Sequence, residues 1–222
     1  MKAWLAWSSG KDSAWALHVL RATPDVEVVG LLTTVNEVHD RVAMHGVRRS
    51  LLQAQADSLG LPLVLAPIPH PCSNEHYETV MSAAVARARE EGIAAFAFGD
   101  LFLEDIRRYR EARLAGTGLV PLFPLWGRPT AALAEQMIAG GLRARVVTVD
   151  PRRLAPSFAG RSFDREFLAD LPADVDACGE NGEFHTFAWD GPMFRRPLDL
   201  RSGAVVEREG FVFADLVPPG EA

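Results

Sequence analysis

Short apolar runs alternate with longer, partly polar stretches through the first 150 residues of the chain. The apolar runs have the length of buried strands, and the stretches between them carry apolar residues at helical spacing. We expect strands over residues 3–7, 26–35, 62–66, 93–98 and 142–149. We expect helices over residues 13–21, 47–59, 75–91, 104–115 and 130–139. This alternation predicts right-handed βαβ units, and therefore an α/β fold with a doubly wound, five-stranded parallel sheet.

The composition and the hydrophobic pattern of the chain change after Asp150. Pro and Gly become frequent, and the remaining apolar pieces, over residues 187–189, 204–208 and 211–214, are short and β-like. We therefore expect two parts. Residues 1–150 form the main α/β domain, and residues 151–222 form a smaller C-terminal α+β subdomain that closes over it.

The composition is that of an ordinary globular protein, with 48% hydrophobic and 23% charged residues. No apolar stretch approaches the roughly 18–20 residues of a membrane-spanning helix, so we expect no membrane association. The chain begins directly with a strand-like segment, which predicts no secretion signal. Cys72 and Cys178 are too far apart for a zinc-finger spacing and too few for a disulfide framework. These features together predict a cytoplasmic protein.

The net charge of −6 argues against a nucleic-acid substrate. Proteins that bind nucleic acids generally present a basic face to the phosphates. Adjacent arginines do occur, but acidic residues surround them, and a solvated surface explains such pairs: 48–49, 107–108, 152–153 and 195–196. RNA as a substrate is therefore disfavoured.

Six small or charged residues connect the first expected strand to the first expected helix: Ser8, Ser9, Gly10, Lys11, Asp12 and Ser13. A turn from a strand into a helix directs free backbone N–H groups, and the positive end of the helix dipole, at one point. Gly10 allows the backbone to approach an anion closely, and Lys11 adds a positive charge. Asp12 suits such a loop only if it caps the helix or helps to hold Mg²⁺. The segment predicts a phosphate-binding loop.

The loop is neither a Walker motif nor the Gly-x-Gly-x-x-Gly of dinucleotide-binding folds. It resembles the Ser-Gly-Gly-x-Asp-Ser signature of the PP-loop ATP pyrophosphatases, with Ser9 in place of the first Gly. The resemblance implies a Rossmann-like fold that holds the pyrophosphate portion of ATP while a substrate attacks the α-phosphorus.

Further segments extend the likeness over roughly residues 2–195. They are Met44-His45, Gly99-Asp100, residues 119–126 (LVPLFPLW), residues 178–186 (CGENGEFHT) and residues 190–194 (DGPMF). Together they resemble the diphthine–ammonia ligase family, a branch of the PP-loop enzymes. The resemblance implies ATP and Mg²⁺ as cofactors, adenylation of a carboxylate with release of pyrophosphate, and displacement of AMP by ammonia.

The last motif departs from the family pattern. Where eukaryotic and archaeal members have Gly-Glu-Gly-Gly-Glu-Tyr-Glu-Thr, this chain has Asn181 for a Gly and His185 for a Glu. The departure resembles a bacterial branch in which the substrate is not settled. The resemblance therefore transfers the chemistry further than the substrate, which is left as a protein side chain or a small molecule carrying a carboxylate.

These arguments assign roles to particular residues. We expect Lys11, Glu180, Glu183 and His185 to act in catalysis, and Asp12 and Glu180 to ligate Mg²⁺. We expect ATP to contact the loop over residues 8–13, and a further set consisting of Thr33, His45, Gly99 and Asp100. Simpler interpretations stay open: the two glutamates as solvated loop charges, His185 as a turn residue, Thr33 as an ordinary strand residue and His45 as a helix cap.

Two other functions are compatible with the loop. A sulfur-transfer or tRNA-modifying PP-loop enzyme would need a reactive Cys pair or a basic face. A nucleotide-sensing module would bind ATP or AMP without chemistry. No glutaminase domain fits within 222 residues, so ammonia would arrive free or from a partner. The oligomeric state stays open, with a homodimer as one option.

Overall fold

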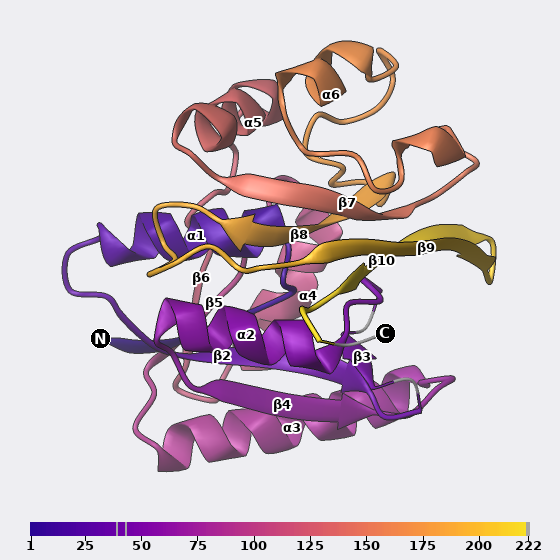
Figure 1. Cartoon of the computed structure of the whole chain (residues 1–222). Helices are drawn as coiled ribbons and strands as arrows, with labels where there is room; N and C mark the ends of the chain where they lie inside the picture. Colours follow the sequence, from indigo (N-terminus) through magenta and orange to yellow (C-terminus); the bar gives the residue numbers. More distant parts are fainter. Residues whose placement is uncertain (39, 43, 221–222) are drawn as a thin grey trace.

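A computed structural model describes residues 1–38, 40–42 and 44–220 as an α/β protein with two sheets (Figure 1). The strands are β1 (Lys2–Ala6), β2 (Glu27–Asn36), β3 (Arg41–Val42), β4 (Leu63–Ile68), β5 (Ala95–Ala97), β6 (Val120–Leu122), β7 (Arg143–Val149), β8 (Phe184–Asp190), β9 (Arg201–Arg208) and β10 (Phe211–Val217). The helices are α1 (Lys11–Arg21), α2 (Arg49–Leu59), α3 (Asn74–Glu90), α4 (Glu104–Leu114), α5 (Thr130–Ala139), α6 (Arg165–Asp170) and the 3₁₀ turn η1 (Pro156–Phe158).

The first sheet is mainly parallel. Strand β1 lies between β2 and β5, β4 continues the sheet beyond β2, and β6 continues it beyond β5, all in parallel. Among the described strands of this sheet, β3 alone is antiparallel, where it pairs with the end of β2. Helices α1 and α2 cover one face, and α3 covers the other (Figure 1). The expected doubly wound α/β architecture is confirmed.

The helices begin and end where local sequence signals place them. Helix α3 starts after Ser73, whose hydroxyl oxygen accepts a hydrogen bond of 3.2 Å from the N–H of His76. Ala84 and Ala88 face the core, and the chain leaves the helix through Gly92 at a φ of +71°. The small residues on the inner face let α3 approach the sheet closely.

The expected strand over residues 142–149 exists, but it does not join the parallel sheet. It is β7, in a second, antiparallel sheet with the order β8–β7–β10–β9. The fifth parallel strand is instead β6, an edge strand only three residues long that contains Pro121. A buried apolar run predicts a strand without specifying its partner, because that depends on distant residues.

The two sheets share a hydrophobic core. One cluster of buried side chains joins β1, α1 and α2 to β7, β8 and α6, with Leu5, Trp7 and Leu17 on one side and Phe167 and Phe187 on the other. A second cluster, around Trp4 and Phe96, lies on the opposite face of the first sheet. The C-terminal sheet therefore packs against the α1 and α2 side (Figure 1).

A carboxylate on β10 fastens the C-terminal sheet to the segment that precedes α2. Asp215 Oδ1 lies 2.8 Å from a guanidinium nitrogen of Arg41, and its Oδ2 lies 2.7 Å from one of Arg48. Burial by itself raises the pKa of Asp215, but hydrogen bonds from Arg48 and Arg41 outweigh it and hold that pKa below 3.8. The ion pairs thus stabilise the folded state when Asp215 is ionised.

We expect Asp215→Asn to lower the free energy of unfolding by about 1–2 kcal/mol at neutral pH, because two partly buried guanidinium groups lose their counter-charge. The folded-state pKa is depressed, so the stabilisation is fully present above the unfolded carboxyl pKa and is lost as pH falls through the lower folded value. Chemical denaturation should show a constant difference from pH 5 to 8 that shrinks below about pH 4. Asp174→Asn, at an exposed carboxylate, is the control. Equal stability of the two variants at pH 7 would contradict this assignment.

Candidate active site

The expected phosphate loop joins β1 to α1. Gly10 is extended, with φ −85° and ψ 174°, and its carbonyl accepts a hydrogen bond of 3.1 Å from Ala14 N–H, the first of the helix. Its carbonyl also accepts 2.9 Å from the Ser13 hydroxyl, which lies 3.2 Å from that of Ser8. The small side chains thus bind to the loop itself. The Gly10 N–H donates 3.3 Å to Ser8 Oγ and the Lys11 N–H donates 3.0 Å to the Thr186 hydroxyl, so an anion at the start of α1 would compete with these two oxygens for the N–H groups.

Ser9 has the backbone conformation of a glycine. Its φ is +69°, and its side chain is fully buried with no hydrogen-bond partner for Oγ among the described residues. Its carbonyl accepts hydrogen bonds from Gln55 Nε2 at 3.0 Å and from Ala188 N–H at 2.9 Å. The left-handed conformation explains why the resembling signature has Gly at this position.

The Lys11 side chain does not extend into solvent. A lysine that binds phosphates would be expected to expose its ammonium group. Its side chain is 2% exposed, and its ammonium donates to Asp12 Oδ2 at 2.8 Å and to the carbonyl of Cys178. The ammonium also lies about 5.5 Å from the ring centres of Phe163 and Phe184. Burial by itself lowers the pKa of Lys11, but the Asp12 carboxylate leads the opposing effects, and the pKa is raised. Lys11 therefore binds the C-terminal motif to the start of α1.

Glu180 connects the last motif to the end of β5. Its Oε1 accepts a hydrogen bond of 2.7 Å from the N–H of Leu101. Burial raises the pKa of Glu180 to about 7, against the effect of that hydrogen bond. Just before Leu101, a side chain on Gly99 would meet the backbone of Asp12 and Ser13 at 3.1 Å. Glycine there lets β5 end directly against the start of α1, so the motifs meet at one edge of the sheet.

Asp100 has a partner of its own in the structure. Its two oxygens accept hydrogen bonds of 2.5 and 3.0 Å from Arg110 on α4. The bidentate pair fixes the start of the loop that leads from β5 to α4. The contact between Asp100 and ATP stays a prediction.

Glu183 is not the solvated loop charge of the simpler interpretation. Its side chain is 2% exposed and lies within its own turn. Oε1 accepts hydrogen bonds from Asn181 Nδ2 at 3.0 Å and from Asp176 N–H at 3.3 Å, and lies 3.7 Å from Arg153. A Gly-rich turn does not guarantee exposure, because it can fold a carboxylate onto its own backbone N–H groups. Glu183 therefore holds the shape of the turn.

Two histidines from distant segments stack beside the phosphate loop. The rings of His45 and His185 are 4.7 Å apart, and His45 Nδ1 lies 3.1 Å from the carbonyl oxygen of Thr186. A side chain on Gly10 would meet the His45 ring at 3.0 Å. Burial, followed by the neighbouring His185, lowers the pKa of His45 to about 3. Burial and then Lys11 lower the pKa of His185 to about 4, so both rings are neutral near pH 7.

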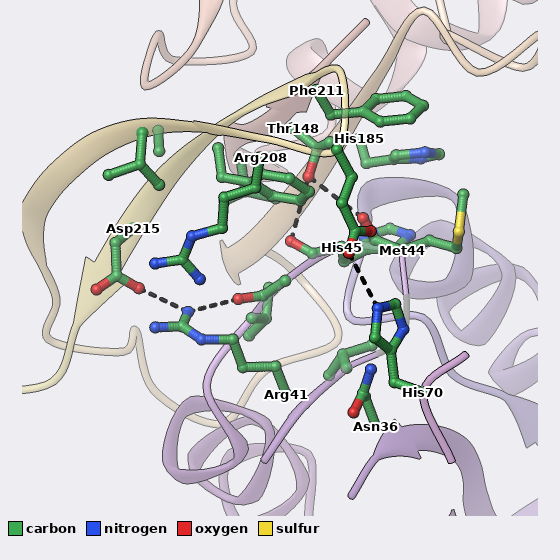
Figure 2. Close-up of a pocket in the computed structure, with 18 of the residues that line it drawn as sticks. Asn36, Arg41, Met44, His45, His70, Thr148, His185, Arg208, Phe211 and Asp215 are labelled. Atoms are coloured by element: carbon green, nitrogen blue, oxygen red, sulfur yellow. Dashed lines mark hydrogen bonds and ion pairs between the residues drawn. The ribbon is translucent and has the colours of Figure 1, made fainter. Parts of the chain in front are cut away.

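The histidines form part of the wall of a pocket of 370 Å³ (Figure 2). The other walls come from the ends of β2 and β4, the segment before α2, and strands β7, β9 and β10. Most of the lining is apolar, and the polar or charged residues in it include Asn36, Arg41, His70, Arg208, Glu209 and Asp215. This pocket could not be predicted from the sequence, because its walls come from segments far apart in the chain.

Thr33 is not among the residues that line this pocket. Its side chain is 1% exposed, and its hydroxyl donates a hydrogen bond of 2.8 Å to the carbonyl of Trp7. The polar side chain that β2 contributes is Asn36, three residues further along. Thr33 thus connects β2 to the chain just after β1.

The two thiols have different environments. Cys178 is buried, its Sγ lies 3.4 Å from the carbonyl of Thr130, and burial raises the pKa of its thiol. Cys72 is partly exposed and lines the pocket. A buried thiol with a raised pKa does not supply the thiolate that sulfur transfer needs.

Family comparison agrees with this arrangement of motifs. Residues 1–115 match the model of the diphthamide synthase N-terminal domain, and residues 129–214 match that of the diphthamide synthase C-terminal domain. The chain belongs to the diphthamide synthase family. The boundary between the two matches precedes β7, in agreement with the place of that strand in the second sheet.

Curated relatives extend over nearly the whole chain. The chain is similar to the diphthine–ammonia ligase of Danio rerio, with 29% identity over 93% of this chain and 89% of that protein. It is similar to those of Bos taurus and Homo sapiens, each with 25% identity over 93% of this chain and 85% of the relative. The expected family is confirmed, whereas these vertebrate relatives do not support the bacterial branch. Within the described ranges, no helix combines the length and apolar character needed to cross a membrane.

We expect Ser9→Gly to raise the free energy of unfolding by about 1 kcal/mol. The change removes a strained left-handed residue and a buried hydroxyl without a partner, and the added freedom of the unfolded chain offsets only part of that gain. Asp25→Gly is the matched control, because Asp25 has a φ of +63° but an exposed side chain. Chemical denaturation gives the free energy of unfolding of both variants. Their difference separates the effect of the buried hydroxyl from the effect of the backbone strain. A less stable Ser9→Gly variant would mean that the hydroxyl makes a stabilising contact.

Proposed function

We propose that the protein is an ATP-dependent acid–ammonia ligase that forms an acyl adenylate. A carboxylate oxygen of the substrate bonds to the α-phosphorus of ATP, and the bond from that phosphorus to the leaving pyrophosphate breaks. Ammonia then attacks the acyl carbon, AMP leaves and a proton is released. Membership of the diphthamide synthase family and relatives named diphthine–ammonia ligase support this proposal. The structural observation that carries it is the meeting of the phosphate loop, the end of β5 and the last motif, through Lys11 and Glu180.

The geometry favours one orientation of the bound nucleotide. The phosphates would bind the N–H groups at the start of α1, where the helix dipole favours negative charge. The nucleoside would enter the 370 Å³ pocket, because that pocket opens at the carboxyl ends of β2 and β4, where ligands bind in open α/β sheets. His45 lines the pocket and lies against Gly10, so it would contact the nucleotide between base and phosphates.

Asp12 would supply a carboxylate ligand to a magnesium ion, in place of the hydrogen bonds that both of its oxygens accept from the Lys11 ammonium. Among the residues that the structure describes, no three His, Cys, Asp or Glu side chains are grouped to hold a metal. Mg²⁺ does not need such a cage, because one or two carboxylates with substrate phosphates and water suffice. Asp12 is 26% exposed and lies at the start of α1. When bound, the ion would neutralise charge on the phosphates.

The side chains have different tasks in this proposal. Of the two expected tasks of Glu180, we assign it the proton step and leave Asp12 as the ligand of the ion. With a pKa of about 7, Glu180 suits the role of accepting the proton that the ammonia nitrogen releases. His185, with a pKa of about 4, is too weak a base for that step and would instead donate or accept a hydrogen bond as a neutral ring. Lys11 would stabilise negative charge at the start of α1, and Glu183 would keep the turn that carries Glu180 in shape.

The alternatives have less support. Sulfur transfer by a pair of cysteines has less support, since Cys178 is buried with a raised pKa and leaves Cys72 as the accessible thiol among the described residues. A sensing module would not need a carboxylate whose pKa is raised into the working range beside the phosphate loop. The acid itself is left open, as a protein side chain or a small molecule, because the last motif differs from the family pattern at His185.

We expect ATP to be cleaved between the α- and β-phosphates. Incubation with Mg²⁺, ammonium and candidate acids, including diphthine-containing protein, should yield AMP and pyrophosphate in equal amounts, because the acid attacks the α-phosphorus. Chromatography of α-labelled ATP measures the products. Glu180→Gln should reduce turnover by about 10²-fold, in the range for loss of a general base. Accumulation of ADP and phosphate would contradict the adenylation mechanism.

We expect nucleotides to protect Cys72 from alkylation. Cys72 lines the pocket and is partly exposed, whereas Cys178 is buried. ATP and AMP should slow the reaction of a maleimide with Cys72 at least fivefold at saturation, because the nucleoside would cover the thiol. Intact-mass spectrometry measures the rate, with Cys72→Ser as the control for labelling elsewhere.

Pyrophosphate alone separates coverage of the pocket from a general closing of the protein. It should leave the labelling rate unchanged, since it carries no nucleoside. Protection by pyrophosphate, or none by ATP under conditions where calorimetry shows ATP bound, would remove the nucleoside from this pocket.

A further inference from the structure

A fully buried glutamine on α2 contacts the phosphate loop and the C-terminal sheet at the same time. Gln55 has no exposed surface, and its amide makes three hydrogen bonds. Its Oε1 accepts 2.9 Å from the indole N–H of Trp7, just after β1. Its Nε2 donates 3.0 Å to the carbonyl of Ser9 and 2.6 Å to that of Ala188 on β8. One flat group thus joins α2 to two segments that are distant from it in sequence, residues 7–9 and β8.

The chemistry of these three partners requires an amide. Two of them are carbonyl oxygens, which need donors, and the third is an indole N–H, which needs an acceptor. An ionised carboxylate has no donor, and an apolar side chain would leave all three groups buried without partners. Asn is shorter by one methylene group. Glutamine alone combines the length of this side chain with a terminal group that donates to two carbonyl oxygens and accepts from the indole N–H.

The hydrogen bonds fix the direction of the Ser9–Gly10 peptide. The Ser9 carbonyl accepts from Gln55 Nε2 and from Ala188 N–H, at 3.0 and 2.9 Å. Because a trans peptide is planar, holding its carbonyl oxygen on one side directs the next N–H, that of Gly10, to the other. The Gly10 N–H belongs to the phosphate loop, at the start of α1, where it donates 3.3 Å to Ser8 Oγ, an oxygen that a phosphate would replace.

The same contacts hold a conformation that the chain would otherwise avoid. Ser9 has a φ of +69°, which costs a non-glycine residue about 1 kcal/mol or more. Without partners on its carbonyl, the peptide could rotate to a less strained conformation and turn the Gly10 N–H away. Gln55 therefore acts on the loop geometry itself as well as on packing.

We propose that Gln55 is a positioning residue that sets the phosphate loop for nucleotide phosphates and couples that setting to the docking of β8. The proposal rests on the proposed function, because it assumes that phosphates bind this loop. It is separate from the proposed chemistry, since Gln55 contacts no reacting group. Its specific consequence is a loss of affinity for the phosphate part of the nucleotide and not for the nucleoside.

The test is calorimetric titration of Gln55→Glu with ATP, pyrophosphate and adenosine at pH 8. The substitution keeps the shape but replaces the two donors with an oxygen that faces two carbonyl groups. The affinities for ATP and pyrophosphate should fall at least tenfold, whereas that for adenosine should change less than twofold. Lowering the pH to 5.5 should restore part of the ATP affinity relative to wild type, because a protonated carboxyl can donate one hydrogen bond.

Two further variants complete the design. Gln53→Glu has the same change of charge on the exposed face of α2 and should bind ATP as the wild type does. Gln55→Met is uncharged and of similar length, and should lose ATP affinity at every pH. Thermal melts accompany each titration, so that affinities are compared only for folded protein.

The outcomes are distinct. Unchanged ATP affinity in Gln55→Glu would overturn the proposal, and so would an equal loss for ATP and adenosine, which would give Gln55 a role in the fold alone. Failure of both Gln55 variants to fold would overturn it in the same way. If the wild type itself bound neither ATP nor pyrophosphate, the proposed function would fail first.

Discussion

The structure depends on the contact between the phosphate loop and β8. Here the carbonyl of Ser9 accepts the N–H of Ala188, the N–H of Lys11 donates 3.0 Å to the hydroxyl of Thr186, and Gln55 joins both segments. These are hydrogen bonds in a water-excluded place, where leaving any one partner unpaired costs about 1–3 kcal/mol. The second sheet therefore cannot shift along the first without breaking them. The relative placement of the two parts is specified by polar groups as well as by the shared apolar core.

The chemistry-bearing residues follow from that contact. Once β8 lies against the loop, the turn before it brings Glu180 to the N–H of Leu101 and the carbonyl of Cys178 to the ammonium of Lys11. The start of β8 brings His185 against His45. Glu180, His45 and His185 are partly buried, and burial lowers the pKa of the histidines and raises that of Glu180 to about 7. The arrangement thus creates the electrostatics of the site by excluding water from it.

The sequence predicted what depends on local periodicity. The helices and strands of the first 140 residues lie within about two residues of the expected ranges, apart from the short strands β3 and β6, which were not expected. Amphipathic spacing and Gly stops are local signals. The partner of β7 was not predictable in this way, since a buried strand looks alike in either sheet. Glu183 and Gln55 were misjudged or missed for a related reason: polar residues in a turn or a helix suggest exposure, and only tertiary contacts bury them.

The pocket beside the histidines has walls from both ends of the chain, with Asn36 and Ile68 on one side and Phe211 and Leu216 on the other. A ribosome releases these segments in order, and domains generally fold as they emerge. The first sheet and its phosphate loop can therefore form while the chain is still being made, but the pocket has no second wall until the last strands leave the exit tunnel. Any ligand that needs the pocket therefore binds only after β9 and β10 have emerged and packed against the first sheet.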